Sequence, residues 1–319
     1  MDFKKISIAK LDLPKFTEFQ KRIFYPLIKK SGSNSASIRD VEYLWKYKGA
    51  WKEGSIYLIE NENKIIGSSG IVPYLMEDYL GNQFWCVQVF DNAVDQVYRK
   101  KNIFYELYDK TYRNEYGYTC FGFPNDNAIA TILKFNGHIK EELSFWVKYR
   151  LNLPLKKSNS CLELSLIQNA SQMPDFAPYI PSLSVRKDKN YIQWRYLTRP
   201  NRVYWVYKIS EDNLEGFSYV ILTTVTYRGI KIYLVLDAVG SNEYYYQNAI
   251  RLFMSKIDKR GLFVALTNDE TQMKAACFLK IPPKLAPKRH YLVYTERDNT
   301  PFQLKSLTWY SSMGDWEVF

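Results

Sequence analysis

The chain has 319 residues, of which 46% are hydrophobic and 24% charged, the profile of a globular protein with about two domains at the usual ~150 residues each. No apolar run reaches the roughly 18 to 20 residues of a membrane-spanning helix, and the charged start has no apolar stretch behind it, so we expect no signal peptide and a cytoplasmic protein. The four cysteines form no CxxC pair and only two histidines are present, which argues against a structural zinc site.

The net charge of +11 favours an anionic partner, which can be a nucleic acid, a membrane surface or a phosphorylated small molecule. Residues 1–150 carry 22 Lys and Arg against 18 Asp and Glu, and the remainder carries 22 against 15. This even spread argues against a nucleic-acid-binding arm. It is compatible with local anion sites on a mixed surface, and equally with no specific partner.

The first half of the chain alternates between strand and helix patterns. Residues 55–76 predict a hairpin that turns at "ENENK". The other elements expected in this half are a long strand (82–94), a helix (about 102–115), a short strand (118–123), a loop and helix that Gly137 ends (124–137) and a strand (143–151). The order indicates an α/β layer arrangement with a strand–helix–strand unit at its centre.

Residues 152–190 are rich in Pro, Ser, Asn and charge, and they predict a linker with short helical pieces. Strand and helix patterns then return. The expected elements are three strands (202–210, 215–225 and 230–240), a helix (243–259), a strand (262–267) and a second helix (269–280).

The two halves correspond in sequence. "VFDNAV" (89–94) is similar to "VLDAVG" (235–240), and "FPNDNAIATILK" is similar to "LTNDETQMKAACFLK". Asp91 precedes Asn125 by 34 residues, and Asp237 precedes Asn268 by 31. The correspondence predicts a degenerate tandem repeat of one domain. Two unrelated α/β halves are the alternative.

Three consecutive cations, Arg99, Lys100 and Lys101, lie between the long strand and the following helix. The helix macrodipole disfavours positive charge there. The unpaired N–H groups of a helix start bind anions, and a pyrophosphate suits that position. Arg99 would add a charge-assisted contact, and the lysines would screen or bind a further phosphate. A solvated basic turn without a ligand is the alternative.

The stretch "DNAVDQVYRKKNIFYEL" resembles the signature of the GNAT superfamily, the Gcn5-related N-acetyltransferases: a strand, then Gln/Arg-x-x-Gly-x-Gly/Ala, then a helix. Arg99 falls on the Gln/Arg position, Asn102 on the first Gly and Phe104 on the Gly/Ala. "FGFPNDNAIATILKFNG" is similar to the second cofactor segment of that superfamily. "YIQWRYLTRP" and "WYSSMGDWEVF" are similar to a tandem GNAT group often encoded with bacterial surface-polysaccharide genes. The resemblance runs from about residue 5 to the C-terminus.

The resemblance implies an α/β (α+β) fold with two GNAT-like domains in tandem, each a mixed, mostly antiparallel sheet flanked by helices. Residues 1–151 would bind the cofactor, 152–190 would be the linker, and 191–319 would be a degenerate domain that shapes the acceptor pocket. The implied co-substrate is acetyl-CoA, without a metal, and a backbone N–H of the long strand would polarise its thioester carbonyl. The residues implied in its binding are Ala93, Val94, Arg99, Lys100, Lys101, Asn102, Ile103, Phe104 and Asn125.

The sequence departs from the GNAT pattern at two positions. Asn102 replaces the first glycine, but asparagine tolerates left-handed backbone better than other non-glycine residues. Ile132 stands at about the place of the tyrosine that protonates the departing thiolate in many members, so a catalytic acid must come from elsewhere, or water must serve.

Two groups are candidates for the general base that an amine acceptor requires. Asp91 would act directly or through water, and its structural alternative is a carboxylate that caps a strand bulge. The carboxylate of Phe319 is the second candidate, because some tandem GNAT relatives, including N-myristoyltransferases, bring their chain terminus into the active site. An ordinary last strand is the alternative, and Asp315 and Glu317 are nearby acids.

The implied function is an acyl-CoA-dependent N-acyltransferase that transfers acetyl to the amine of an amino sugar, free or nucleotide-linked, in surface-polysaccharide biosynthesis. No nucleic-acid partner and no membrane span are expected. Two other classes stay open: a non-catalytic GNAT-fold scaffold with a degenerate CoA loop, and an aminoacyltransferase that uses aminoacyl-tRNA.

Overall fold

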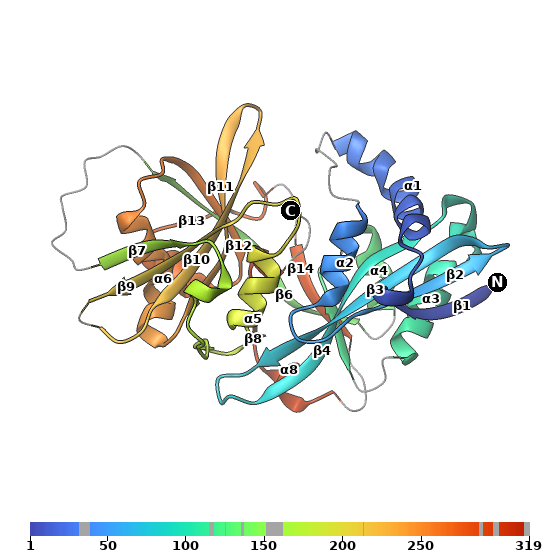
Figure 1. Ribbon diagram of the computed structural model, residues 1–319, viewed down its shortest axis with the longest axis horizontal. Coiled ribbons are helices and arrows are strands. Elements are labelled where there is room, and N and C mark those ends of the chain that lie inside the picture. Colours follow the sequence, from blue (N-terminus) through green and yellow to red (C-terminus); the bar gives the residue numbers. More distant parts are fainter. Residues whose placement is uncertain are drawn as a thin grey trace.

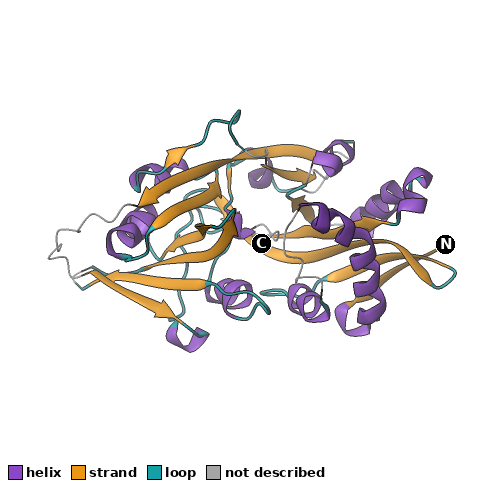
Figure 2. Cartoon of the chain, turned by 90° about the horizontal axis from the view of Figure 1, so that it is seen from above, coloured by secondary structure: helices purple, strands orange, loops and turns teal. Residues whose placement is uncertain are grey.

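The structure is a computed structural model that describes residues 1–31, 39–114, 118–124, 126–134, 137–150, 162–212, 214–286, 290–295 and 300–315. It is a mixed α/β protein in which helices flank one long sheet (Figures 1 and 2). The sheet runs in the order β1-β2-β3-β4-β5-β14-β6-β12-β11-β10-β9-β7. Among the described residues, no helix is long and apolar enough to span a membrane.

The N-terminal half, residues 1–150, contributes one end of this sheet (Figure 1). Its strands are β1 (Asp2–Ser7), β2 (Ser55–Asn61), β3 (Lys64–Glu77), β4 (Gln83–Val94), β5 (Thr119–Gly122) and β6 (Gly137–Arg150). Its helices are η1 (Ile8–Lys10), α1 (Leu13–Ser31), α2 (Asp40–Lys48), η2 (Gln96–Lys101), α3 (Ile103–Asn114) and α4 (Asp126–Leu133).

The C-terminal half, residues 162–315, contributes the other end. Its strands are β7 (Leu162–Ile167), β8 (Leu183–Val185), β9 (Trp205–Glu211), β10 (Ser218–Tyr227), β11 (Ile230–Gly240), β12 (Gly261–Thr267), β13 (Leu279–Lys280), β14 (His290–Thr295) and β15 (Trp309–Tyr310). Its helices are η3 (Ala170–Gln172), α5 (Lys189–Ile192), η4 (Gln193–Leu197), α6 (Glu243–Lys256), α7 (Glu270–Ala275), α8 (Phe302–Ser306) and η5 (Met313–Asp315).

Strand β6 joins the two halves. Its first part, Gly137–Leu143, pairs with β14, and its second part, Ser144–Arg150, pairs with β12. Strand β14, from the C-terminal half, lies between β5 and β6 and so completes the sheet of the N-terminal half. The predicted division at residues 151 and 191 stays a prediction.

Aromatic packing fixes the halves to each other. The indole rings of Trp45 and Trp194 stack with centroids 5.1 Å apart. Each ring also donates its N–H to the backbone carbonyl of the other tryptophan, at 2.7 and 3.0 Å. Stacked aromatic pairs with satisfied polar tips contribute about 0.5–1.5 kcal/mol beyond the area they bury. The pair therefore holds α2 of one half against η4 of the other.

The two halves share a topology, as the sequence repeat indicates. In each half an antiparallel hairpin (β3–β4 or β10–β11) is followed by a helix and a strand parallel to the second hairpin strand. The register of each hairpin shifts close to the corresponding aspartate, Asp91 or Asp237. Register shifts at corresponding places, near Asp91 and near Asp237, support the prediction that the two halves arose by duplication of one domain.

Most predicted elements are confirmed, and three predictions need correction. The last strand of the N-terminal half begins at Gly137 and not at 143, because Gly137 opens β6 against the end of α4; a Cβ there would lie 2.5 Å from the Ile132 carbonyl oxygen. Residues 162–167, predicted as linker, form β7 and pair with β9. The helix expected over 269–280 ends at Ala275, and Cys277 turns the chain with φ +55°.

Candidate active site

A large cavity opens where β4 and β5 diverge. These strands pair in parallel only over Cys86–Gln88 and Thr119–Phe121. Beyond this point they separate around a cavity of about 850 Å³. Its walls come from β4, β5, α1, α3, α4 and β14, with the lining residues of β4 running from Gln88 to Val94. Pockets of roughly 300–1,000 Å³ are typical of small-molecule and cofactor sites.

Strand β4 bulges inside this cavity at Asp91, whose φ is +48°. Opposite the bulge, Gly70 gives room for Tyr47, since a Cβ on Gly70 would lie 1.6 Å from the tyrosine hydroxyl. That hydroxyl donates to Asp91 Oδ2 at 2.7 Å. The bulge is therefore held by side chains from α2 rather than by strand pairing alone.

Asp91 forms an ion pair with Lys46. The Lys46 ammonium lies 2.9 Å from both carboxylate oxygens, and the side chains are only 9% and 14% exposed. Both oxygens of Asp91 are thus already acceptors. These contacts favour the structural role for Asp91, because Lys46 and Tyr47 hold its carboxylate at the bulge.

The mouth of the cavity is the turn after β4. The Asp95 carboxylate caps η2 by accepting from the Val97 N–H at 3.3 Å. Asn102 then adopts the left-handed conformation, with φ +57°, and α3 begins at Ile103. Asn102 thus has the left-handed backbone that the sequence analysis expects an asparagine to tolerate at the position of the signature glycine. The first-turn N–H groups of α3 have no partners within the helix, as at every helix start.

Arg99 lies at this mouth. It is exposed, it lines the cavity, and its Nε donates to the Val94 carbonyl oxygen at 3.2 Å. That bond anchors the base of the guanidinium group beside the end of β4. An anchored guanidinium is well suited to hold an anion by two parallel hydrogen bonds.

Four of the nine implied cofactor residues and the candidate base Asp91 come together here. Asp91, Ala93, Val94, Arg99 and Phe104 line the cavity, whereas Asn102 lies exposed in the turn and Ile103 packs into the core behind it. Lys100 and Lys101 belong to η2. Asn125 and Phe319 lie outside the described residues.

Sequence reasoning missed the long-range members of the site. Lys46 and Tyr47 come from α2, and Thr295 comes from β14, where its hydroxyl lies 3.2 Å from that of Tyr108. Ile132 lines the cavity and is buried, so this wall supplies no acid at that position. The described residues contain no group of three or more His, Cys, Asp or Glu placed to hold a metal ion.

Comparison with solved structures identifies the fold. The chain superposes on a GCN5-related N-acetyltransferase from Anabaena variabilis with a TM-score of 0.60 and 12% identity, covering 92% of this chain and 72% of that one. It matches a probable N-acyltransferase of unknown function from Enterococcus faecalis with a TM-score of 0.64 and 8% identity, covering 92% and 71%. It also matches Saccharomyces cerevisiae N-myristoyltransferase with bound myristoyl-CoA, with a TM-score of 0.50 and 10% identity, covering 97% and 89%.

No protein-family model matches the chain, and no curated protein matches it either. At these identities the structural likeness shows the fold alone. The chain has a GNAT-like fold, as the resemblance of residues 91–107 implies.

Proposed function

We propose that the protein is an acyl-CoA-dependent N-acyltransferase that uses acetyl-CoA and acylates the amine of a small acceptor, with an amino sugar of surface-polysaccharide biosynthesis as the specific candidate. The observation that carries this proposal is the open crevice between β4 and β5, which ends at Arg99 and the start of α3. The bulge of β4, the basic turn η2 and the start of α3 follow one another along the chain. The amino-sugar acceptor rests on the sequence resemblance alone.

Different parts of the site would bind different parts of the co-substrate. The N–H groups at the start of α3 and the guanidinium of Arg99 would hold the pyrophosphate. The arm of the co-substrate would then follow β4 inward from Val94. Ala93 or Val94, which pair with β3 opposite Ser68 and Gly67, would offer a backbone N–H to the thioester carbonyl.

The reaction itself is a direct acyl transfer. The amine nitrogen attacks the thioester carbonyl carbon, the C–N bond forms and the C–S bond breaks. The amine gives up a proton to a base, and the thiolate takes one from an acid or from water. The preorganised donors on β4 would stabilise the negative charge that develops on the carbonyl oxygen.

Two carboxylates that are candidates for the base, Asp91 and Asp315, already form ion pairs. Both carboxylate oxygens of Asp91 already accept hydrogen bonds, from Lys46 and from Tyr47. The side chain of Asp315 is likewise occupied, because it accepts from the Ser312 N–H at 2.9 Å and from Lys187 at 3.2 Å. The carboxylate of Phe319 stays a proposal. Adding one residue after Phe319 tests it: kcat should fall while CoA affinity stays unchanged if this carboxylate is the base.

Calorimetric titration with CoA and acetyl-CoA tests the function. We expect micromolar binding to the wild type and a loss of about ten- to hundredfold in Arg99→Glu, since a charge-assisted contact contributes about 1.5–3 kcal/mol. Arg251→Glu is the matched control, because Arg251 is exposed on α6, away from the cavity. No binding by the wild type would refute the proposal and favour the scaffold class.

A further inference from the structure

A two-stranded ribbon, residues 223–231, projects from one end of the C-terminal half as the tip of the β10–β11 hairpin (Figure 1). Strand β9 pairs with β10 only as far as Leu222, and β12 pairs with β11 only from Ile232 onward. Among the described residues, no other strand pairs with the ribbon. Its tight turn has φ values of +49° at Arg228 and +79° at Gly229. A two-stranded hairpin is only marginally stable in water on its own, so contact with a partner would stabilise this ribbon.

The ribbon is amphipathic. Residues paired across two strands share a face, and so do alternate residues along one strand. Tyr227 pairs with Ile230, and Val225 lies two residues before Tyr227, so these three side chains lie on one face. They are 60%, 61% and 37% exposed, respectively. The other face carries the pair of Thr226 and Lys231. Single exposed apolar side chains are ordinary, but three together on a free ribbon indicate an interaction surface.

The ribbon lies at a basic end of the C-terminal half. The ammonium groups of Lys231 and Lys259 lie 5.9 and 5.2 Å from the ring centroid of Trp205. The Thr223 hydroxyl donates to the Val203 carbonyl oxygen at 2.9 Å, which brings residues 201–205 to the base of the ribbon. Together, residues 201–205, 223–232 and 256–260 contain six Lys and Arg and a single acid, Asp258. This end of the molecule therefore favours an anionic partner.

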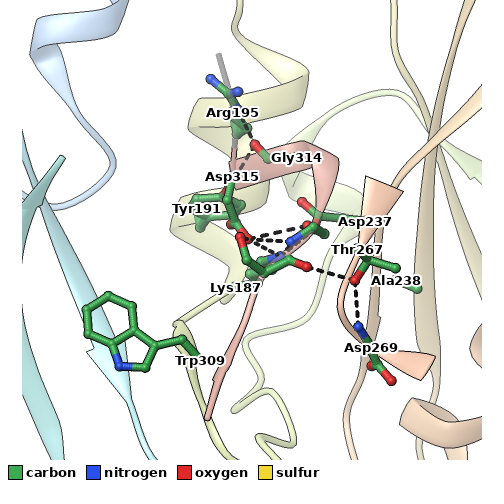
Figure 3. A network of polar contacts seen from close by, with 12 residues as sticks. Lys187, Tyr191, Arg195, Asp237, Ala238, Thr267, Asp269, Trp309, Gly314 and Asp315 are labelled. Carbon is green, nitrogen blue, oxygen red and sulfur yellow. Dashed lines mark hydrogen bonds and ion pairs between the residues drawn. The ribbon is translucent and has the colours of Figure 1, made fainter. Parts of the chain in front are cut away.

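The opposite end of the same strands has the reverse balance. Residues 208–217 and 241–247, around the β9–β10 connection and the start of α6, contain four acids and one lysine. Farther along β11, Lys187 pairs with the buried carboxylates of Asp237 and Asp315, so these interior charges are matched within the protein (Figure 3). The basic charge is thus a local property of the ribbon end and not of the whole half.

An anionic bilayer surface matches this end better than a nucleic acid does. Nucleic acids stack their bases on aromatic rings, and here the rings of Trp205 and Tyr227 already have cations over them, from Lys231 and Arg228. A nucleic acid would also leave the aliphatic side chains of the ribbon in water. A bilayer satisfies both features, because its headgroups attract Lys and Arg and its interfacial layer accepts tyrosine and aliphatic side chains.

We propose that the ribbon is a peripheral docking element for an anionic lipid bilayer. Val225, Tyr227 and Ile230 enter the interfacial layer, and Arg228 and Lys231 contact the phosphate headgroups. The bilayer then covers the apolar face that the fold leaves in water. This inference is independent of the proposed function, because no residue of the ribbon lines the cavity between β4 and β5.

Flotation with lipid vesicles tests the charge contacts. We expect the wild type to bind phosphatidylcholine vesicles that contain about one third phosphatidylglycerol, and not phosphatidylcholine alone. Arg228→Glu with Lys231→Glu should weaken binding about thirtyfold or more, since each basic group near the surface contributes about fivefold. Lys10→Glu with Lys21→Glu is the matched control: both lysines are exposed in the N-terminal half, and their distance from the ribbon should limit the loss to about threefold or less at about 0.1 M salt. Equal losses in the two double variants would overturn the proposal.

A second double variant tests insertion of the apolar face. Tyr227→Ser with Ile230→Ser keeps every cation and should weaken binding about tenfold or more, because the apolar side chains no longer leave water. Phe302→Ser is the matched control, since Phe302 is 75% exposed on α8. The Tm of each variant verifies that it is folded. Full binding by Tyr227→Ser with Ile230→Ser would refute insertion. No binding of the wild type to the anionic vesicles would refute the proposal outright, and binding of single-stranded DNA in their place would identify a nucleic-acid surface.

Discussion

The ion pair between Lys46 and Asp91 gives the sharpest prediction for stability. The ammonium lies 2.9 Å from both carboxylate oxygens, and the side chains are 9% and 14% exposed. Lys46→Met removes the cation but keeps most of the side-chain volume. It leaves Asp91 unpaired at a strained bulge, so we expect a loss of about 3–5 kcal/mol, the usual cost of breaking a buried pair.

The assay is urea unfolding at neutral pH, followed by tryptophan fluorescence. The double variant Lys46→Met with Asp91→Asn should lose less than the sum of the single variants, by about 1–3 kcal/mol, because no charge is then left unpaired. Lys110→Met is the matched control: its pair with Glu106 is as short, at 2.8 Å, but the side chains are 40% and 47% exposed. A loss for Lys46→Met no greater than that for Lys110→Met, which we expect to be about 0.5 kcal/mol or less, would refute the reasoning.

Three further predictions concern other parts of the fold. Hydrogen bonds from two lysine ammonium groups lower the pKa of Glu60 below its ordinary 4.5, so this carboxylate contributes stability that is present above that value and lost as the pH falls through the lowered pKa. Glu60→Gln should therefore narrow the difference in Tm between about pH 7 and about pH 3, and an unchanged difference would contradict this. Asn102→Ala should lower the free energy of unfolding in urea by about 1 kcal/mol and Asn102→Gly should leave it unchanged, because the residue is left-handed at φ +57°. Equal effects of the two substitutions would contradict a left-handed backbone at this position. Alkylation of the native protein should label exposed Cys277 long before buried Cys86, because burial raises the pKa of the Cys86 thiol. Peptide mass mapping of the labelled protein measures the order, and labelling of Cys86 first would contradict the prediction.

Local patterns were sufficient where one segment forms a complete structural unit. The hairpin of β2 and β3 was predicted from its polar turn, and Glu62 and Asn63 adopt the positive φ values that such a tight turn requires. The strand, turn and helix around residues 91–107 were also predicted, because hydrophobic spacing and the basic turn are local signals. The left-handed backbone of Asn102 was expected from the same stretch, because asparagine tolerates that conformation.

Contacts between distant segments could not be predicted from a single sequence. Helices α1 and α2 were not predicted, although α2 supplies Lys46 to the site. Strand β14 was not expected to enter the N-terminal sheet, since nothing in its six residues specifies a partner about 150 residues away. Part of the cavity wall, including Thr295 of β14, comes from such distant segments, and this is why it was the least predictable part.

The two crevices, the first between β4 and β5 and the second between β11 and β12, share a strand arrangement but differ in what occupies them. Both diverge after a short parallel pairing and carry an acid near a hairpin bulge. In the first, the acid pairs with Lys46 of α2 and the crevice stays open towards Arg99. In the second, the acid pairs with Lys187, which also holds Asp315, and the crevice is filled. The sequence difference that separates them is small: a basic turn follows Val94, whereas Gly240 is followed directly by Ser241 and the Asn242 cap of α6. Within one architecture, the first crevice is therefore open beside a basic turn, whereas the second is occupied by the chain's own residues 309–315.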